Sequence, residues 1–490
     1  MSSSAGDTLD TRGESGAEGA AEDLRPALAI LHASEGRLLG AILPLPNRGE
    51  PRVLGRGERD ASDRHPRALP VAQRPNRNET LAGFADPYLS REQLVLTSDS
   101  GGIRVQNVGK RELLDASGRA VDELVLAPGE IAEVRGRLLL LATSRPTTLP
   151  AARSLGRSFH AFGEADPHGL VGESAVAWKL RDLAAFVAAR TAHVLLLGES
   201  GTGKEVVAQT VHELSGRKGK RLVSRNAATL PAGLIDAELF GHVANYPNAG
   251  MPERQGLIAE ADGSSLFLDE IGELPHELST RLLRVLDAKG EYQRLGDPKP
   301  RTSSFRLIAA TNRPVASLKS DVAARFRLRL SVPSLDERRE DIPLLARHLL
   351  RRAATKDSDI GERFFEGWNG RTGEPRMSTD LVRALVTHAY RTHVREIDLL
   401  LWASLASSPG DVAELTPEVE AELAAAARGG SEPPGQAGPR VDTRQLTAED
   451  VRAAIERAGG VHEKAWKDLG LANRHVLKRL VKKFGLREDG

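Results

Sequence analysis

The chain has 490 residues, which is too long for a single hydrophobic core and suits about three domains of ordinary size. Apolar residues make up 40% of the sequence and charged residues 28%, so the composition is that of a folded globular protein and not of a disordered one. Cysteine is absent, which excludes disulfides, thiol catalysis and Cys-ligated metal sites.

The formal net charge is only +1, but two terminal blocks carry opposite charges. Residues 1–24 contain six acidic residues and one arginine, whereas residues 451–490 contain ten basic and five acidic residues. We therefore expect the two ends to have different partners. No apolar stretch approaches the roughly 20 residues of a membrane span, and the N-terminus has no apolar signal segment, so we expect a cytoplasmic protein that does not contact a membrane.

The first part of the chain predicts an acidic tail followed by a β-rich domain. The tail offers almost nothing to bury and is predicted to be disordered. The β-rich part has short apolar runs separated by Gly, Pro and Asp, a pattern typical of an all-β sandwich. The segments are a tail over 1–24, a sandwich over 25–145 and a Pro/Arg/Gly-rich linker over 146–168.

The rest of the chain predicts an α/β domain and then helices. Helical stretches alternate with short apolar strands, which indicates a parallel sheet, and helix then follows helix. A Gly/Pro-rich linker precedes a compact run of short helices at the end. The segments are an α/β domain over 169–333, a helical domain over 334–427, a linker over 428–446 and a C-terminal domain over 447–490.

A glycine-rich loop directly after the apolar strand at residues 193–197 is the strongest signal in the sequence. Its glycines let backbone N–H groups approach phosphates, the helix that follows adds its dipole, and a lysine reaches the terminal phosphates. The loop consists of Gly198, Glu199, Ser200, Gly201, Thr202, Gly203 and Lys204, and is followed by Glu205 where a Ser or Thr is usual.

Two further strands end in polar residues that suit phosphoanhydride hydrolysis. Residues 265–268 lead into Asp269 and Glu270, and one carboxylate to hold Mg²⁺ with one to activate water is what this chemistry needs. Residues 305–310 lead into Thr311 and Asn312, which are placed to sense the γ-phosphate.

These motifs resemble those of the AAA+ domain of bacterial enhancer-binding proteins, the ATPase activators of sigma-54 RNA polymerase. The matching stretches are GESGTGKE, Asn226 with the later ELFGH, LFLDEIGELP and RLLRVLDAKGEYQRLG, within about residues 170–405. In this family GKE is the ordinary form, so Glu205 is no defect. The resemblance implies an ATP- and Mg²⁺-dependent ATPase that works as a ring, usually a hexamer.

The resemblance also implies roles for single residues. Lys204 would bind phosphate, Asp269 would hold magnesium and Glu270 would activate water. Asn226 would be the switch residue that holds this glutamate, and Thr311 with Asn312 would form the first sensor. Arg395 matches the second sensor, although Thr392 and His393 replace the Gly and Asn of the family's GNVRE motif.

Two positions depart from the family pattern. Of the two trans-acting arginines, Arg325 is present but the other is Lys319, which keeps the charge and loses the bidentate fork, so weaker catalysis is expected. The sigma-54-contacting loop GAFTGA is replaced by Asn245, Tyr246, Pro247, Asn248, Ala249 and Gly250. A proline at the phenylalanine position argues against contact with sigma-54 by the usual means.

The C-terminal residues resemble the Fis-type helix-turn-helix of such activators. The turn is at residues 469–471, and the helix at about 473–483 has apolar residues on one face. The opposite face, which would meet DNA phosphates and bases, carries Arg474, His475, Lys478, Arg479 and Lys482.

The N-terminal β region resembles a forkhead-associated (FHA) domain, a sandwich that binds phosphothreonine. Leu54-Gly55-Arg56 is similar to the family's first loop, and Ser90 and Arg91 to its SRxH loop, with Gln93 in place of the histidine. Arg56, Ser90 and Arg91 would hold the phosphate of a partner protein or kinase. Asn107 is a loose match to the later Asn-Gly pair, and residues 58–84 form a long insertion. A sandwich without a working phosphate pocket is the open alternative.

The leading hypothesis is a signal-responsive transcription regulator. An FHA-like sensor would control an AAA+ ring ATPase that acts on sigma-54 polymerase and binds an enhancer-like DNA site. The alternative is a nucleotide- and DNA-binding regulator, such as a repressor, that does not remodel sigma-54 polymerase. The altered loop favours the alternative, whereas the Asp269–Glu270 pair favours retained ATP hydrolysis.

Overall fold

The computed structural model describes residues 8–9, 24–47, 49–58, 64–156, 159–230, 234–274, 281–282, 284–287, 290–428 and 452. Within these ranges, none of the helices is both long enough and apolar enough to cross a membrane. Nearly all of the predicted C-terminal domain, including its basic recognition helix, lies outside the described residues.

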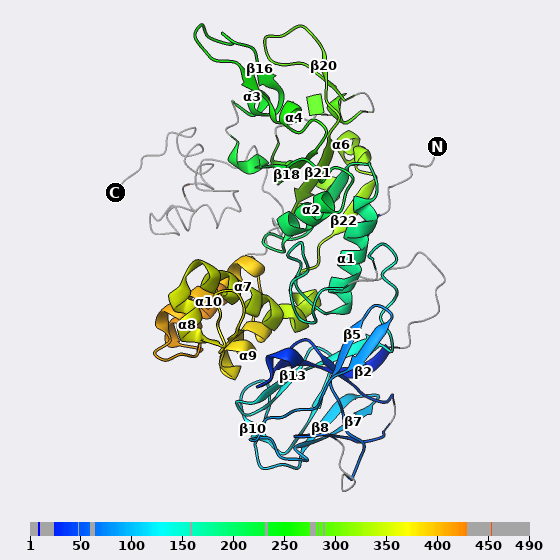
Figure 1. Cartoon of the computed structure of the whole chain (residues 1–490), viewed down its shortest axis with the longest axis vertical. Coiled ribbons are helices and arrows are strands. Elements are labelled where there is room, and N and C mark those ends of the chain that lie inside the picture. Colours follow the sequence, from blue (N-terminus) through cyan, green and yellow to red (C-terminus); the bar gives the residue numbers. More distant parts are fainter. Residues whose placement is uncertain are drawn as a thin grey trace. The chain divides into compact units, whose positions relative to one another are not determined.

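The residues after Leu24 form a sandwich of two antiparallel sheets (Figure 1). The larger sheet, in spatial order, contains β10 (Ala120–Val121), β9 (Leu113–Leu114), β12 (Ile131–Val134), β13 (Leu138–Pro146), β2 (Leu24–His32), β3 (Ile42–Pro44), β5 (Val71–Arg74) and β6 (Arg77–Thr80). The smaller sheet contains β11 (Glu123–Leu126), β8 (Gly102–Asn107), β7 (Leu94–Asp99) and β4 (Arg52–Leu54). The predicted all-β character of this part agrees with these sheets.

Alternation of apolar side chains produces the sandwich. In β7 the residues Leu94, Leu96 and Ser98 are buried and their neighbours are not, which is the period of two that a half-covered strand requires. Leu94 and Leu96 pack into one core with Leu28 and Ile30 of the larger sheet, and all four are fully buried. The two sheets therefore enclose a core of their own.

The long insertion predicted over residues 58–84 contains a β-hairpin. Strands β5 and β6 pair in antiparallel register from Val71–Thr80 to Arg74–Arg77, and Asn76 in the turn has a φ of 56°. Asparagine tolerates this left-handed conformation better than most residues. The hairpin extends the edge of the larger sheet.

The central part is an α/β domain with a parallel sheet, as predicted. In spatial order its strands are β1 (Thr8–Leu9), β22 (Leu328–Ser331), β14 (Val194–Leu197), β21 (Arg306–Thr311), β18 (Ser265–Asp269) and β15 (Val223–Asn226). The helices are α1 (Ala175–Ala188), α2 (Lys204–Glu213), α3 (Ile235–Phe240), α4 (Leu257–Glu260) and α6 (Ser320–Arg325). Figure 1 shows α1 and α2 beside the strands β18, β21 and β22.

Strand β1 differs from the expectation for the acidic tail. Thr8 and Leu9 pair in parallel with Arg329 and Leu330 of β22, although the sequence predicted no regular structure here. The physical reason is that β22 would otherwise be an edge strand, whose backbone groups can pair with any extended segment.

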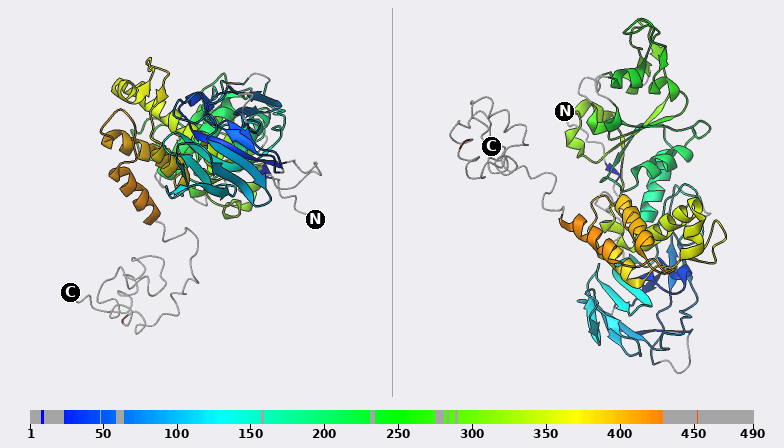
Figure 2. Two further views of the ribbon diagram at one scale, coloured as in Figure 1. Left: turned by 90° about the horizontal axis from the view of Figure 1, so that it is seen from below. Right: turned by 90° about the vertical axis from the view of Figure 1, so that its left-hand side faces the viewer.

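The helical part consists of α7 (Ile342–Lys356), α8 (Ser358–Phe364), α9 (Thr379–Thr387), α10 (Val394–Ser407) and α11 (Pro417–Arg428). In both views of Figure 2 these helices, coloured yellow to orange, lie next to one another. The predicted succession of helices is interrupted by a small hairpin of β23 (Phe365–Glu366) and β24 (Glu374–Pro375).

The sandwich and the helical part share one hydrophobic core. The outward-facing side chains of the larger sheet and the apolar face of α7 belong to the same buried cluster, which includes Ala29, Leu31, Leu139, Leu141, Leu344, Leu345 and Tyr390. Ion pairs flank it: Arg383 of α9 contacts Glu133 of β12 at 2.7 Å. The predicted domain boundaries stay predictions, since the core continues across them.

Candidate functional site

The glycine-rich loop joins the end of β14 to the start of α2. Gly201 and Gly203 have φ values of 80° and 100°, a region in which side chains are strained. A Cβ on Gly201 would also lie only 1.9 Å from the carbonyl oxygen of Thr392. Glycine is therefore required both by the turn of the loop and by the close approach of the segment before α10.

Lys204 is the first residue of α2 and is almost completely buried, with 6% of its surface exposed. Its ammonium group donates hydrogen bonds of 2.9 Å to the carbonyl oxygens of Gly198 and Glu199. Burial lowers the pKa of Lys204, and the nearby carboxylates of Glu270 and Asp269 oppose this shift. The positive charge is thus held inside the loop, beside the helix N-terminus that favours anions.

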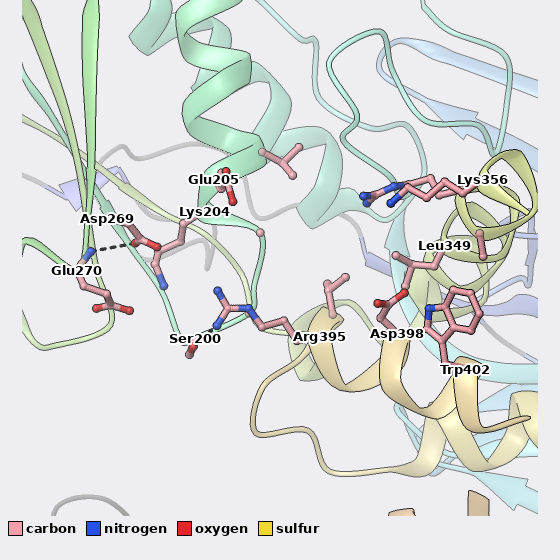
Figure 3. A pocket seen from close by; sticks show the side chains of 16 residues that line it. Ser200, Lys204, Glu205, Asp269, Glu270, Leu349, Lys356, Arg395, Asp398 and Trp402 are labelled. Atoms are coloured by element: carbon pink, nitrogen blue, oxygen red, sulfur yellow. Dashed lines mark hydrogen bonds between the residues drawn. The ribbon is translucent and has the colours of Figure 1, made fainter. Parts of the chain in front are cut away.

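Asp269 and Glu270 lie at the carboxyl end of β18, as predicted. The backbone N–H of Glu270 donates to the Asp269 carboxylate at 3.0 Å, and Glu270 has a φ of 52°. This turn directs the two carboxylates differently, and Figure 3 shows both on the same side of the pocket as the Lys204 ammonium group. A sparsely populated backbone conformation at such a position is typical of a functional site.

The start of α10 closes over the loop. Arg395 donates to the hydroxyl of Ser200 at 3.2 Å, and the N–H of Val394 donates to the carbonyl of Gly201 at 3.1 Å. His393, which is 1% exposed and has a φ of 47°, contacts the Glu199 carboxylate at 3.0 Å. The histidine that replaces the expected asparagine therefore begins the helix and fastens it to the loop.

These residues line a cavity of about 320 Å³. Its walls come from the loop, from the end of β18 and from α7 and α10, as Figure 3 shows. The volume and the mixture of a buried cation, backbone N–H groups and carboxylates fit a nucleotide better than an apolar ligand. Two carboxylates also fit Mg²⁺, which usually takes one or two protein carboxylates and completes its shell with phosphates and water. Among the described residues no cluster of three or more metal-ligating side chains occurs.

Comparison with known proteins connects this cavity to a family. Residues 170–335 match the family model of the sigma-54 interaction domain. The transcriptional regulatory protein ZraR of Salmonella typhimurium is 35% identical over 322 residues, which are 64% of this chain and 68% of that protein. The chain belongs to the transcriptional regulators with a sigma-54 interaction domain. The formate hydrogenlyase transcriptional activator FhlA of Escherichia coli is 34% identical over 313 residues, 62% of this chain and 42% of that protein.

A solved structure is also similar to the chain. NtrX from Brucella abortus, crystallised in complex with ATP, is 27% identical and is matched with a TM-score of 0.45. The match covers 65% of this chain and 69% of that one.

The structure brings together most of the site residues predicted for this sigma-54 interaction domain. The residues that line the cavity include Ser200, Gly201, Gly203, Lys204, Glu205, Asp269, Glu270 and Arg395. Gly198, Glu199 and Thr202 belong to the loop but do not line the cavity. The Thr202 hydroxyl donates a hydrogen bond of 2.9 Å to the Glu199 carbonyl oxygen within the loop.

Three predicted residues lie near the cavity but do not line it. Asn226 ends β15 opposite Asp269, and its side-chain oxygen accepts a hydrogen bond of 2.8 Å from the N–H of Ala228. Thr311 is fully buried at the end of β21, where its hydroxyl accepts from the N–H of Arg313 at 3.1 Å, and Asn312 follows it on the surface. Their roles as switch and sensor remain predictions.

The two predicted trans-acting residues lie at α6 and do not line the cavity. Arg325, the last residue of α6, pairs with Asp287 at 2.9 Å with almost half of its side chain exposed. Lys319 precedes the helix as its N-terminal cap. Their roles across a subunit interface stay predictions.

The loop at Asn245–Gly250 connects β16 (Gly241–His242) with β17 (Arg254–Gln255) and is exposed throughout. The Tyr246 ring packs on Gly296, where a Cβ would lie 2.6 Å from it. The Asn245 side chain accepts a hydrogen bond of 2.8 Å from the N–H of Gly250, which closes the loop on itself. The aromatic residue of the loop therefore lies against the body of the domain.

Several residues of the cavity were not predicted from the sequence. Arg352 and Lys356 of α7 and Asp398 and Trp402 of α10 complete its wall. Arg338 of the short helix η5 (Asp336–Asp341) does not line the cavity but supports the loop: it is 5% exposed and donates a hydrogen bond of 3.0 Å to the carbonyl oxygen of Thr202. The available signal was weak, since Arg338 lies in a charged run that reads as a solvated turn.

The predicted phosphate-binding residues of the sandwich lie side by side. The N–H of Arg56 donates to the Ser90 carbonyl at 2.9 Å, and the Ser90 hydroxyl accepts from the N–H of Lys110 at 3.0 Å. Gln93 is fully buried and connects Ser90 with the end of β8: it accepts from the N–H of Ser90 at 3.2 Å and donates to the side chain of the half-buried Asn107 at 2.8 Å. Gln93 and Asn107 therefore fix the position of Ser90.

Proposed function

We propose that the chain is an ATP-hydrolysing transcription regulator that acts on sigma-54 RNA polymerase. The observation that carries the proposal is the convergence of Lys204, Asp269, Glu270 and Arg395 on one cavity inside a sigma-54 interaction domain. Lys204 and the loop N–H groups would hold the phosphates, Arg395 would report their presence to the helical part, and Glu270 would take a proton from the attacking water. Mg²⁺ held by Asp269 would neutralise the phosphate charge.

The assembly in this proposal is a ring, a hexamer as in the resembling family. Arg325 would reach the nucleotide of the next subunit and stabilise the charge that develops on the transferred phosphoryl group. Its exposed position at the end of α6 supports this role. Lys319 would supply a second, weaker positive charge, because an ammonium group cannot form the paired hydrogen bonds of a guanidinium.

The proposal includes DNA binding at an enhancer-like site through the C-terminal residues. The support for DNA binding is the sequence resemblance to a Fis-type helix-turn-helix. The predicted DNA-binding residues lie outside the described residues: Arg474, His475, Lys478, Arg479 and Lys482. A basic face of this kind would bind phosphates first and read base edges second.

The sharpest test is open-complex formation by sigma-54 polymerase on a cognate promoter. We expect ATP-dependent isomerisation, and we expect Tyr246→Ala to reduce it more than the matched change Met251→Ala just outside the loop, because Tyr246 is the aromatic residue of the loop. If the promoter complex fails to isomerise although ATP is hydrolysed, the alternative of a nucleotide-controlled DNA-binding regulator replaces the proposal. The family match supports the first outcome and the altered loop the second.

The N-terminal sandwich is proposed to be an FHA-like sensor for a phosphothreonine protein or kinase. We expect Arg56→Ala to weaken the binding of a phosphothreonine peptide by roughly tenfold or more, since hydrogen bonds to a charged group contribute about 1.5–3 kcal/mol. Arg104→Ala is the matched control, because Arg104 is exposed on β8 and pairs with Glu123. Fluorescence anisotropy measures both. Peptide binding that survives Arg56→Ala would favour the sandwich without a phosphate pocket.

A further inference from the structure

The sandwich contains a cavity that is separate from the predicted phosphothreonine-binding residues, since Arg56, Ser90 and Arg91 do not line it. It has a volume of about 490 Å³ and is bordered by β2, β3, β5, β6 and β13 of the larger sheet, by β4 and by residues 67–69. Four arginines line it, Arg25, Arg52, Arg67 and Arg145, together with leucine and proline side chains. None of the described residues in its wall is an aspartate or a glutamate. We name it the arginine cavity.

Arg145 is the most buried of these arginines. It lies near the end of β13 with 3% of its surface exposed, and its Nη2 atom pairs with the Glu340 carboxylate at 2.8 Å. The Nε and Nη1 atoms of the same guanidinium are buried without a hydrogen-bond partner. Buried polar atoms are almost always paired, so two unpaired donors on one guanidinium indicate a missing acceptor. Nε and Nη1 lie on different edges of the guanidinium, so these two donors require two separate acceptor oxygens.

Gln73 adds a second unpaired group to the wall of the cavity. It is 4% exposed, and its Nε2 atom donates to the Pro146 carbonyl at 2.8 Å, which fixes the orientation of the amide. The Oε1 atom of the same amide can only accept a hydrogen bond, and it has no partner. A ligand that satisfies both residues must present oxyanion oxygens to Arg145 and a hydroxyl donor to Gln73.

We propose that the arginine cavity binds a small organic oxyanion, a carboxylate or a phosphate ester that also carries a hydroxyl group, with Arg145 as its buried anchor. The volume lies in the range of small-molecule sites, and the leucine and proline walls leave room for the carbon skeleton. Arg145 and Arg52 are paired with Glu340 and Glu50, and Arg25 and Arg67 add further positive charge to the wall, which attracts such an anion.

The ligand would share Arg145 with Glu340, which is paired with the Nη2 atom. Glu340 belongs to the short helix η5, whose Arg338 donates to the Thr202 carbonyl of the phosphate loop at 3.0 Å. Burial raises the pKa of Glu340, and Arg145 opposes this shift. The arginine cavity is thus connected to the phosphate loop through Arg145, Glu340 and Arg338.

The test is calorimetric titration of the full chain with citrate and with glycerol 3-phosphate. ADP and Mg²⁺ are kept at saturation, so that neither probe binds at the phosphate loop. The two probes distinguish a carboxylate from a phosphate ligand, and tricarballylate, which is citrate without its hydroxyl, tests the role of Gln73. We expect one of the two hydroxylated probes to bind at millimolar concentration or below, and tricarballylate to bind less tightly than citrate if the carboxylate is preferred.

The variants decide whether Arg145 is the anchor. Arg145→Gln should weaken binding of the preferred probe by about tenfold or more, and Arg135→Gln, an exposed arginine paired with Glu112, should leave it unchanged. If Arg145→Gln fails to fold, the double variant with Arg145→Gln and Glu340→Gln is measured instead. It removes both members of the buried ion pair and leaves no unpaired charge. Absence of binding by both hydroxylated probes, or binding that is unchanged without Arg145, would overturn the proposal.

Discussion

Replacing Glu270 with glutamine should slow ATP hydrolysis by about 10²–10⁴-fold, because positioned general bases contribute a factor of this size. Glutamine has nearly the same shape and keeps the turn after β18, but it cannot accept a proton from water. Nucleotide binding should persist, since Lys204 and the loop glycines are unchanged. Phosphate release measures the first effect, and the binding of a fluorescent ATP analogue measures the second.

Glu273→Gln is the matched control for this prediction. Glu273 lies three residues further on, at the end of η3 (Ile271–Glu273), where its carboxylate pairs with Arg313 at the surface. It does not line the cavity. The assignment of Glu270 is wrong if Glu270→Gln hydrolyses ATP as fast as Glu273→Gln does.

The phosphate loop and its carboxylates could be predicted because their signals are local. A strand, a glycine turn and a helix follow one another directly at residues 193–213, and Asp269 follows its own strand. The carboxyl ends of neighbouring parallel strands meet at one edge of the sheet, so these residues converge without further information. The positions of Lys204 and Asp269 in the structure agree with that expectation.

The contributions of Arg338 and of α7 could not be predicted because they depend on contacts between distant segments. Arg338 and Thr202 are 136 positions apart in the sequence. Periodicity shows that one face of α7 is apolar, but it does not reveal what covers that face. For this reason the sequence suggested a sandwich separated by a linker from the rest, whereas the structure shows a core common to the sandwich and α7.

A substitution in this common core should have a large effect on the stability of the protein. Leu344 of α7 is 1% exposed and lies against the sandwich: a Cβ on Gly40 would be only 2.9 Å from its Cδ1 atom. Leu344→Ala should therefore lower the free energy of unfolding by about 2–5 kcal/mol, since it leaves a cavity that a close-packed core cannot fill. Leu399→Ala is the control on the neighbouring helix α10, because Leu399 is 56% exposed, and it should change the stability by about 0.5 kcal/mol at most.

Urea unfolding followed by hydrogen exchange tests whether the core joins the two parts. Leu139 of β13 belongs to the same buried cluster as Leu344, so Leu139→Ala should reduce the protection of backbone amides in α9 as well as in the sandwich. Separate cores would give the opposite pattern, with Leu139→Ala loosening the sandwich alone and Leu344→Ala the helices alone. A shared transition would mean that a ligand bound to the sandwich stabilises the helical part by mass action. The sandwich would then influence the domain that carries the phosphate loop through packing, without a hinge between them.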